Sequence, residues 1–294
     1  MAAHTWEAIA ASIAHAIGEP FLADSANPIG GGCINRGFHL KGHGRDFFVK
    51  LNAASALAMF EAEAAGLREI AATSTVRVPL PVCTGSDPER AWLALEYLPL
   101  SSDGQHAMAA LGERLAALHR VTSATFGWTR GNTIGSTLQV NTPQPEWSEF
   151  WVHRRLGYQL DLADRSGHRG VLQRKGELLL QRVPSLLAGH RPAASLVHGD
   201  LWGGNAAAIA GEPVIFDPAV YYGDREVDLA MTRLFGGFPS EFYSAYENAW
   251  PLEHGHRERR DLYNLYHVLN HLNLFGGGYL RQALQMIDRL LAAA

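Results

Sequence analysis

Three oxygen-bearing side chains near residue 200 constrain this chain more than any other feature of its sequence. Asp200 and Asn205 lie five positions apart in the segment Val-His-Gly-Asp-Leu-Trp-Gly-Gly-Asn, and Asp217 ends an apolar run that follows the turn Gly-Glu-Pro. A divalent metal such as Mg²⁺ takes hard oxygen ligands of this kind from more than one segment. An additional aspartate beside such a site can accept a proton. The pattern predicts a catalytic loop followed by a strand that ends in a metal ligand.

The secondary structure that the sequence predicts changes near residue 100 of the 294 residues. Before that point, the sequence predicts an N-terminal amphipathic helix, strands within 27–51 and 91–98, an extended segment 76–82, and a helix over 54–72. After it, the sequence predicts helices over 108–121, 147–165, 171–187, 238–250, 257–275 and 279–291, with short strands and loops over 196–220. We therefore expect an α+β fold with two lobes around a cleft. A small β-rich N-terminal lobe would span 1–98, and a larger, mostly helical C-terminal lobe would span 99–294.

The spacing of Asp200 and Asn205 is that of the catalytic loop in protein kinases, where His-Arg-Asp is followed by four residues and an Asn. In that loop the Asp accepts the proton of the attacking hydroxyl and the Asn binds Mg²⁺. Asp217 stands where kinases place their second metal ligand, with Pro218 in place of the usual Phe. Gly199 replaces the Arg that pairs with a phosphorylated activation loop, which indicates a kinase without that switch. A protein-kinase-like fold is thus predicted, with Asp200 as the catalytic base.

An ATP-binding set is predicted upstream of this loop. Lys50 lies in the apolar strand Phe-Phe-Val-Lys-Leu, where a lysine needs partners such as the α- and β-phosphates of ATP and a helix carboxylate. Glu63 on the following helix fits that carboxylate, and Glu61 is the alternative on a different face. The remaining ATP-binding candidates are the glycine turn Gly31, Gly32 and Cys33, and the hinge residues Glu96, Tyr97 and Leu98, whose backbone groups would bind adenine.

Composition excludes several other classes of protein. The net charge of -4 and the pI of about 6.4 argue against a nucleic-acid partner. No apolar run approaches the ~20 residues of a membrane span, and the N-terminus has no basic region of a signal peptide, so a cytoplasmic protein is expected. Two cysteines make no disulfide framework. His267 and His271 have helical i, i+4 spacing, but they lack the Glu of a zinc-protease helix.

These segments together resemble the fructosamine kinase (ketosamine-3-kinase) family over almost the whole chain. The most specific matches are the His-Gly-Asp-Leu-Trp-Gly-Gly-Asn loop and the segment His-Leu-Asn-Leu-Phe-Gly-Gly-Gly-Tyr, residues 271–279. The resemblance implies ATP-dependent phosphorylation of small-molecule or protein-bound ketosamines at the 3-hydroxyl, a deglycation activity. It also implies that Asp200 is the base, that Lys50 holds the phosphates, and that Asn205 and Asp217 hold Mg²⁺. Trp202 would wall the sugar pocket, and His198 joins it in the predicted substrate set.

Several alternatives stay open at this level. Another small-molecule kinase, of the aminoglycoside or choline/homoserine type, and an inactive nucleotide-binding pseudokinase share most of these motifs. Cys33 is either a redox switch, which would make the protein a disulfide-linked homodimer rather than a monomer, or a small buried residue. Asp224 and Asp228 contact substrate or, as we favour, form a structural network, and His119 is expected to be structural.

Overall fold

The chain folds into two compact units. The computed structural model describes residues 3–30, 34–101 and 107–293. The first unit comprises Met1–Ala107 with Ala207–Asp217, and the second comprises Met108–Ala206 with Pro218–Ala294. The predicted α+β class is confirmed, with a β-rich first unit and a helical second unit. In contrast to the predicted lobes 1–98 and 99–294, the first unit also includes residues 207–217.

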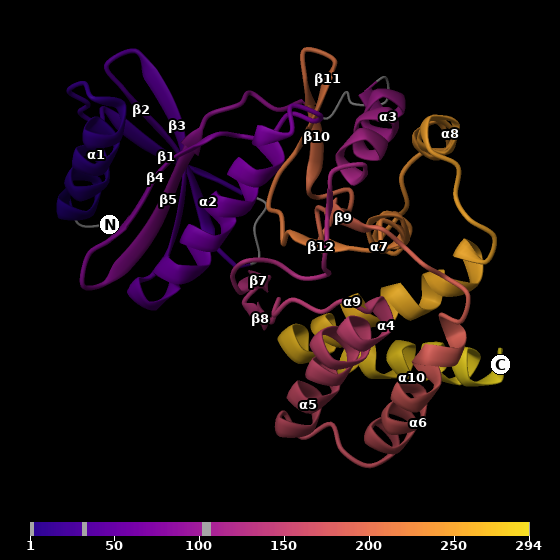
Figure 1. Ribbon diagram of the computed structural model, residues 1–294. Helices are drawn as coiled ribbons and strands as arrows, with labels where there is room; N and C mark the ends of the chain where they lie inside the picture. The colour runs from indigo at the N-terminus through magenta and orange to yellow at the C-terminus, as the bar shows by residue number, and fades with distance from the viewer. Residues whose placement is uncertain (1–2, 31–33, 102–106, 294) are drawn as a thin grey trace. The chain divides into compact units, whose positions relative to one another are not determined.

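A five-stranded antiparallel sheet forms the first unit, in the order β1-β2-β3-β5-β4. Its strands are β1 (Ser25–Ile29), β2 (Arg36–Gly42), β3 (Arg45–Ala53), β4 (Pro81–Ser86) and β5 (Arg90–Glu96). Its helices are α1 (Ala3–Ile17), the short 3-10 helix η1 (Ala54–Ala56) and α2 (Leu57–Ala72). Figure 1 shows α1 and α2 on either side of this sheet.

The side chains of β3 alternate between the two faces of the sheet, so this strand contributes both to the apolar core and to the predicted ATP-binding set. Phe47, Val49 and Leu51 point to one face and join the apolar core that includes Ile9 and Ile13 of α1. Neighbouring side chains on a strand point to opposite faces, so Lys50 points to the other face, where α2 lies. The sequence pattern of β3 thus fixes which helix Lys50 can meet.

A hairpin from far along the chain completes the first unit. It consists of β10 (Ala206–Ile209) and β11 (Glu212–Ile215). The backbone of Ala208 exchanges hydrogen bonds with Ser101, at 2.9 and 3.4 Å, and the Ile215 amide donates to the Arg77 carbonyl at 3.0 Å. These contacts carry Asp217, two residues after the hairpin, into the same unit as Lys50.

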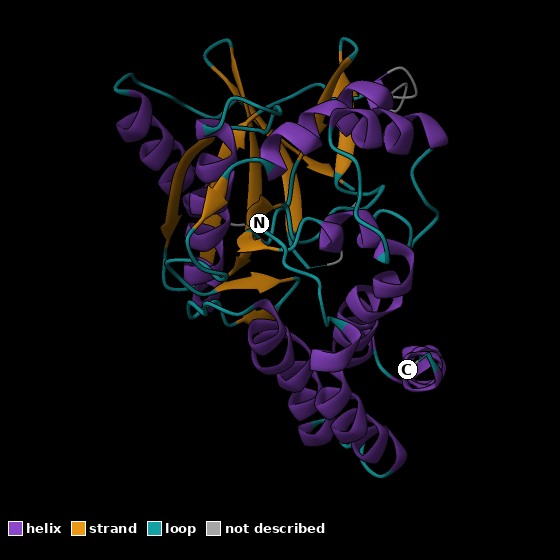
Figure 2. Cartoon of the chain, turned by 45° about the vertical axis from the view of Figure 1, so that its right-hand side comes forward, coloured by secondary structure: helices purple, strands orange, loops and turns teal. Residues whose placement is uncertain are grey.

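The second unit consists largely of helices, and its strands are short (Figure 2). The helices are α3 (Ala107–His119), α4 (Trp147–Phe150), a π-helical segment (Trp151–Leu156), α5 (Gly157–Arg165), α6 (Val171–Leu186), α7 (Glu226–Met231), α8 (Ser240–Ala249), α9 (His256–Phe275), the 3-10 helix η3 (Gly277–Tyr279) and α10 (Leu280–Ala292). The strands are β6 (Thr122–Ser123), β7 (Asn132–Ile134), β8 (Thr137–Gln139), β9 (Ala194–Val197) and β12 (Tyr221–Gly223), with β9 between β12 and β6. Among the described residues, no helix is long and apolar enough to cross a membrane.

Candidate functional site

A buried ion cluster in the first unit joins three of the predicted site residues. The Lys50 ammonium donates hydrogen bonds to the carboxylates of Glu63 and Asp217. The side chains of Lys50 and Glu63 are 6% and 12% exposed, whereas that of Asp217 is 44% exposed. Glu61, the alternative partner, lies on the exposed face of α2. The structure therefore pairs Lys50 with Glu63, as the helical spacing predicted.

Electrostatic interactions within the cluster keep the Lys50 side chain protonated. Burial alone would favour a neutral amine, but the two carboxylates raise the pKa of Lys50 above its ordinary value. Burial, together with the charge of Asp217, raises the pKa of Glu63, and Lys50 opposes that shift. Asp217 adopts a left-handed backbone conformation with φ of +56°. Such a conformation is sparsely populated for residues other than glycine and is found often at functional sites.

The predicted hinge lies at the end of β5. The Glu96 side chain forms an ion pair with Arg77, and the Glu96 amide donates to the Leu80 carbonyl at 2.9 Å. Tyr97 stacks on His39 of β2, with ring centroids 3.6 Å apart and planes within 3°. The Leu98 carbonyl accepts a hydrogen bond from the Leu100 amide. Gly31, Gly32 and Cys33, the predicted glycine turn, lie outside the described residues.

In the second unit, Asp228 of α7 binds the backbone of the predicted catalytic loop. Its carboxylate accepts hydrogen bonds from the backbone amides of His198 at 2.7 Å and Gly199 at 2.8 Å. His119 of α3 contacts the same carboxylate at 3.1 Å and the Tyr246 hydroxyl at 2.8 Å. Burial opposes ionisation of Asp228, but the hydrogen bonds from His119 and Gly199 lower its pKa overall. Asp228 and His119, for which structural roles were predicted, therefore stabilise the backbone of this loop: Asp228 binds it directly, and His119 binds Asp228.

The backbone at Gly199 explains why this position is not arginine. Its φ is +81°, and an added Cβ would lie 2.2 Å from the carbonyl oxygen of Ala219. A left-handed residue in contact with backbone leaves room only for glycine. The absent arginine thus reflects the backbone conformation of this loop.

Replacing Gly199 by alanine should lower the free energy of unfolding by at least about 2 kcal/mol, since strain and a backbone clash add. Gly203→Ala is the matched control, because a Cβ there meets nothing within 4 Å, and we expect a change below about 0.5 kcal/mol. Urea unfolding of both variants measures the difference. Equal midpoints for Gly199→Ala and wild type would contradict this account.

Asn205 is held so that its amide oxygen is the atom left for a metal. Its Nδ2 donates to the Asp200 carbonyl at 2.8 Å and lies 3.4 Å from the Asp200 carboxylate. The backbone amide of Asn205 donates to the backbone carbonyl of Trp202 at 2.9 Å. The remaining Oδ1 is a hard oxygen donor of the kind Mg²⁺ prefers, and so is the half-exposed carboxylate of Asp217. Each of the two predicted ligands therefore offers an oxygen atom of the type that Mg²⁺ prefers.

His198 needs a correction. The sequence placed it among the substrate contacts, but its side chain is 0% exposed, and its Nδ1 accepts a hydrogen bond from the Asp200 amide at 3.2 Å. A fully buried imidazole cannot touch a substrate. His198 is a positioning residue that fixes the backbone of Asp200 from inside the loop.

Trp202, by contrast, faces outward and begins a row of aromatic side chains. It is 38% exposed, and its indole lies over Gly204, where an added Cβ would come within 2.4 Å of the ring. Phe235 contacts Trp202 edge-on, with centroids 6.3 Å apart, and His271 lies 4.7 Å from Phe235. Sequence reasoning did not place Phe235 or His271 beside Trp202. The signal for His271 was its place at the start of the C-terminal segment that matches the family.

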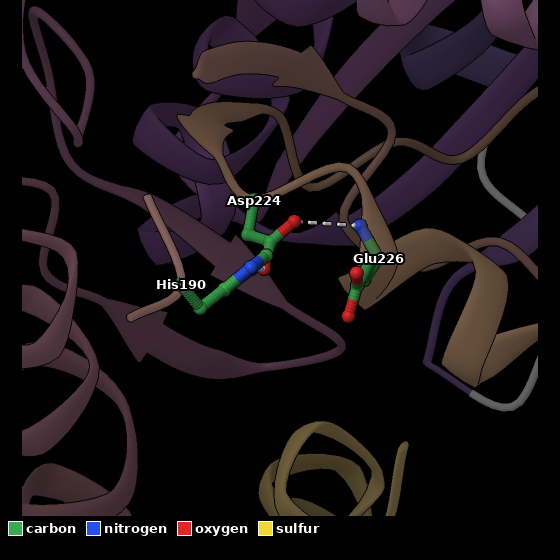
Figure 3. Close-up of side chains that lie close together, drawn as sticks. All are labelled: His190, Asp224 and Glu226. Atoms are coloured by element: carbon green, nitrogen blue, oxygen red, sulfur yellow. Dashed lines mark hydrogen bonds and ion pairs between the residues drawn. The ribbon is translucent and has the colours of Figure 1, made fainter. Parts of the chain in front are cut away.

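A second polar cluster, His190, Asp224 and Glu226, has the residue types of a metal site (Figure 3). Its hydrogen bonds are already made. Asp224 accepts from His190 at 2.6 Å and from the Tyr263 hydroxyl at 2.5 Å, and Glu226 forms a two-point ion pair with Arg259. Glu253 binds the other ring nitrogen of His190 at 3.0 Å. The cluster is a network of hydrogen bonds and ion pairs, in agreement with the structural role favoured for Asp224.

This network predicts a pH-dependent stability. Burial disfavours a charged imidazole, but the hydrogen bond and charge of Asp224, with Glu226 adding and Arg259 opposing, raise the pKa of His190. A raised pKa means that the stabilisation is fully present below the unfolded pKa, about 6.5, and is lost as pH rises through the folded value. The free-energy difference between wild type and His190→Gln should therefore shrink from pH 6 to pH 9 in urea titrations. A constant difference would refute the linkage.

Comparison with known proteins gives consistent matches along the whole chain. A profile of the fructosamine kinase family matches residues 5–293. A Synechocystis protein named probable ketoamine kinase is 48% identical over 288 residues, which cover 97% of each chain. A chloroplastic protein-ribulosamine 3-kinase of Arabidopsis thaliana is 44% identical over 90% of this chain and 81% of its own. A crystal structure from Haemophilus somnus, assigned as a fructosamine-3-kinase, superposes with a TM-score of 0.91 at 30% identity over 97% of each chain.

Proposed function

Because the chain belongs to the fructosamine kinase family and is therefore a phosphotransferase, we propose that it transfers the γ-phosphate of ATP to the 3-hydroxyl of a ketosamine. The acceptor would be a fructosamine or ribulosamine adduct of an amine or lysine. The observation that carries the proposal is the Asp200 loop, held by Asp228 beneath and bordered by the exposed ring of Trp202. Phosphorylation at this position would make the adduct decompose, so the reaction would act as deglycation and protein repair.

On the nucleotide side, the surroundings of Lys50 and of the hinge residues support their roles, and the glycine turn is assigned from the sequence alone. Lys50, charged and held by Glu63, would bind the α- and β-phosphates. Backbone groups of Glu96, Tyr97 and Leu98 would bind adenine, and the glycine turn at Gly31, Gly32 and Cys33 would cover the phosphates.

Asp217 and Asn205 would each offer an oxygen ligand to Mg²⁺. When bound, the ion neutralises the developing charge on the β- and γ-phosphates. Lys50 donates a hydrogen bond to the Asp217 carboxylate in this structure. It would therefore also hold that carboxylate in position to bind the metal.

On the acceptor side, Asp200 would take the proton of the sugar hydroxyl. The transition state of phosphoryl transfer is loose, so positioning of that hydroxyl contributes more than early proton removal. Trp202 would stack against the sugar and exclude water. His271 would border the same pocket with an uncharged ring, because burial lowers its pKa. Its Nδ1 is directed to the His267 carbonyl at 2.8 Å.

The remaining expectations are part of this proposal. The enzyme would act in the cytoplasm, on small-molecule or protein-bound ketosamines, and as a monomer unless Cys33 links two chains by a disulfide. Cys83 is the wrong cysteine for such a switch, because burial raises the pKa of its thiol to about 11.

Other small-molecule kinases are the alternative. Aminoglycoside phosphotransferases share the fold, with a TM-score of 0.64 at 15% identity, and likeness at that identity says nothing of the acceptor. An inactive pseudokinase is disfavoured because Lys50, Asp200, Asn205 and Asp217 are all present.

The test is a panel of initial rates of ADP formation with Mg-ATP and ribulose-lysine, fructose-lysine, kanamycin, choline or homoserine. We expect turnover with a ketosamine and none above background with the other three. Turnover only on kanamycin, choline or homoserine would mean that the enzyme acts on that class of acceptor and not on ketosamines. No turnover on any of them, with intact ATP binding, would favour the pseudokinase.

A further inference from the structure

The aromatic row that begins at Trp202 continues well beyond the catalytic loop. His271 lies on the last turns of α9 and contacts both Phe275 and Tyr279, with ring centroids 5.4 and 5.1 Å away. Phe275 and Tyr279 also face each other at 6.5 Å. The row thus runs from the loop through Phe235 and His271 to the end of α9 and to η3.

The far end of this row is open to solvent. Phe275 is 53% exposed, one of the most exposed large apolar side chains among the described residues. The glycines at 277 and 278 follow it, and an added Cβ at either would meet nothing within 4 Å. No side chain of the described residues therefore covers this surface of η3 next to Phe275. Exposed aromatic groups that adjoin a site are typical of ligand contacts, whereas a packed helix end would bury them.

The row also carries no cationic member. Burial lowers the pKa of His271, so its ring is neutral near pH 7. The other members are Trp202, Phe235, Phe275 and Tyr279. Such a surface favours an apolar or aromatic group, and it tolerates the positive charge of a nearby amine because ring faces attract cations.

We propose that Phe235, Phe275 and Tyr279 form a carrier subsite, which binds an apolar or aromatic group close to the amine that bears the ketosamine. This inference rests on the proposed function and deepens it. Trp202 is exposed and lies two positions after Asp200, and the row continues from its ring to Phe235, so an acceptor at Asp200 would lie near the start of the row. The steps from Trp202 to Phe275 measure 6.3, 4.7 and 5.4 Å between centroids, at most about five residues of extended peptide at ~3.3 Å each. The preferred carrier is therefore a flexible peptide with a large apolar residue beside the modified lysine.

The test uses two peptides that differ only at the residues beside one ribulosylated lysine, glycine in one and phenylalanine in the other. For wild type we expect a KM about tenfold lower for the phenylalanine peptide with an unchanged kcat, since a half-buried ring contributes about that factor. Phe275→Ala should bring the ratio of the two KM values close to one. Leu178→Ala is the matched control: Leu178 on α6 is 56% exposed, and its removal should leave the tenfold ratio in place.

Equal KM values for the two peptides in wild type, or a tenfold ratio that survives in Phe275→Ala, would overturn the subsite. Turnover of free ribulose-lysine tests the proposed function separately, because that acceptor has no flanking residue. If no ketosamine is phosphorylated, anisotropy of the two labelled peptides still decides: tighter binding of the phenylalanine peptide that disappears in Phe275→Ala supports the subsite. Equal dissociation constants refute it.

Discussion

Replacing Asp200 by asparagine should lower kcat on a ketosamine acceptor by about a hundredfold to ten-thousandfold, the usual contribution of a positioned general base. The KM for ATP should change by less than about threefold, because Asp200 itself is assigned to the acceptor hydroxyl, whereas the phosphates and their metal are assigned to Lys50, Asn205 and Asp217. The loss would belong to the chemical step. It would therefore appear in single-turnover rates as well as in steady-state kcat.

The design of the loop makes this substitution informative. The Asp200 backbone is held on both sides, by the Nδ1 of His198 and the Nδ2 of Asn205. Asparagine has nearly the same shape as aspartate, so the loop should keep its conformation and lose only the proton acceptor. Unfolding midpoints of the variant and wild type check this directly. Asp161→Asn on the exposed face of α5 is the matched control and should keep the wild-type rate. Retention of more than a tenth of kcat in Asp200→Asn would remove Asp200 from its proposed role.

Local periodicity predicted much of what surrounds Lys50. The period-two pattern of β3 and the helical phase of α2 are both readable in the sequence, and together they selected Glu63 over Glu61. The long helices were predicted for the same reason, because their apolar residues repeat over several turns. Short elements such as α7 and the β7–β8 pair have too few residues for such a pattern, and they were missed.

Contacts over long sequence separations could not be predicted in this way. Ser101 pairs with Ala208, 107 positions away, and this pairing moves the β10–β11 hairpin into the first unit. Asp228 reaches back 30 positions to the His198 amide. His198 was predicted as a substrate residue, yet it lies two positions before Asp200 with its side chain buried in the interior. Side-chain direction in a loop depends on backbone angles that carry no sequence period.

Removing the Lys50 ammonium should affect both stability and catalysis, and a second substitution should separate the two. Lys50→Met leaves the Glu63 carboxylate buried without its cation. We expect the free energy of unfolding to fall by about 3 kcal/mol, as is usual for one broken partner of a buried ion pair. We also expect kcat/KM for ATP to fall by at least about a hundredfold, if Lys50 holds the phosphates.

The pH dependence of that destabilisation has a defined sign. The pKa of Glu63 is already raised, and loss of Lys50 should raise it further. A carboxyl group whose folded pKa exceeds its unfolded pKa stabilises the fold at low pH, and this contribution is lost as pH rises. Lys50→Met should therefore be less destabilised, relative to wild type, at pH 5 than at pH 8.

The double variant Lys50→Met/Glu63→Gln distinguishes the structural role of the lysine from its catalytic one. With Glu63 made neutral, no fully buried carboxylate is left unpaired, since Asp217 is 44% exposed and can turn to water. Most of the lost stability should return, as measured by urea unfolding at pH 8, while kcat/KM for ATP stays as low as in the single variant. Recovery of both quantities would mean that Lys50 acts only by neutralising Glu63. Recovery of neither would mean that Asp217, rather than Glu63, is the carboxylate that depends on Lys50 for its charge balance.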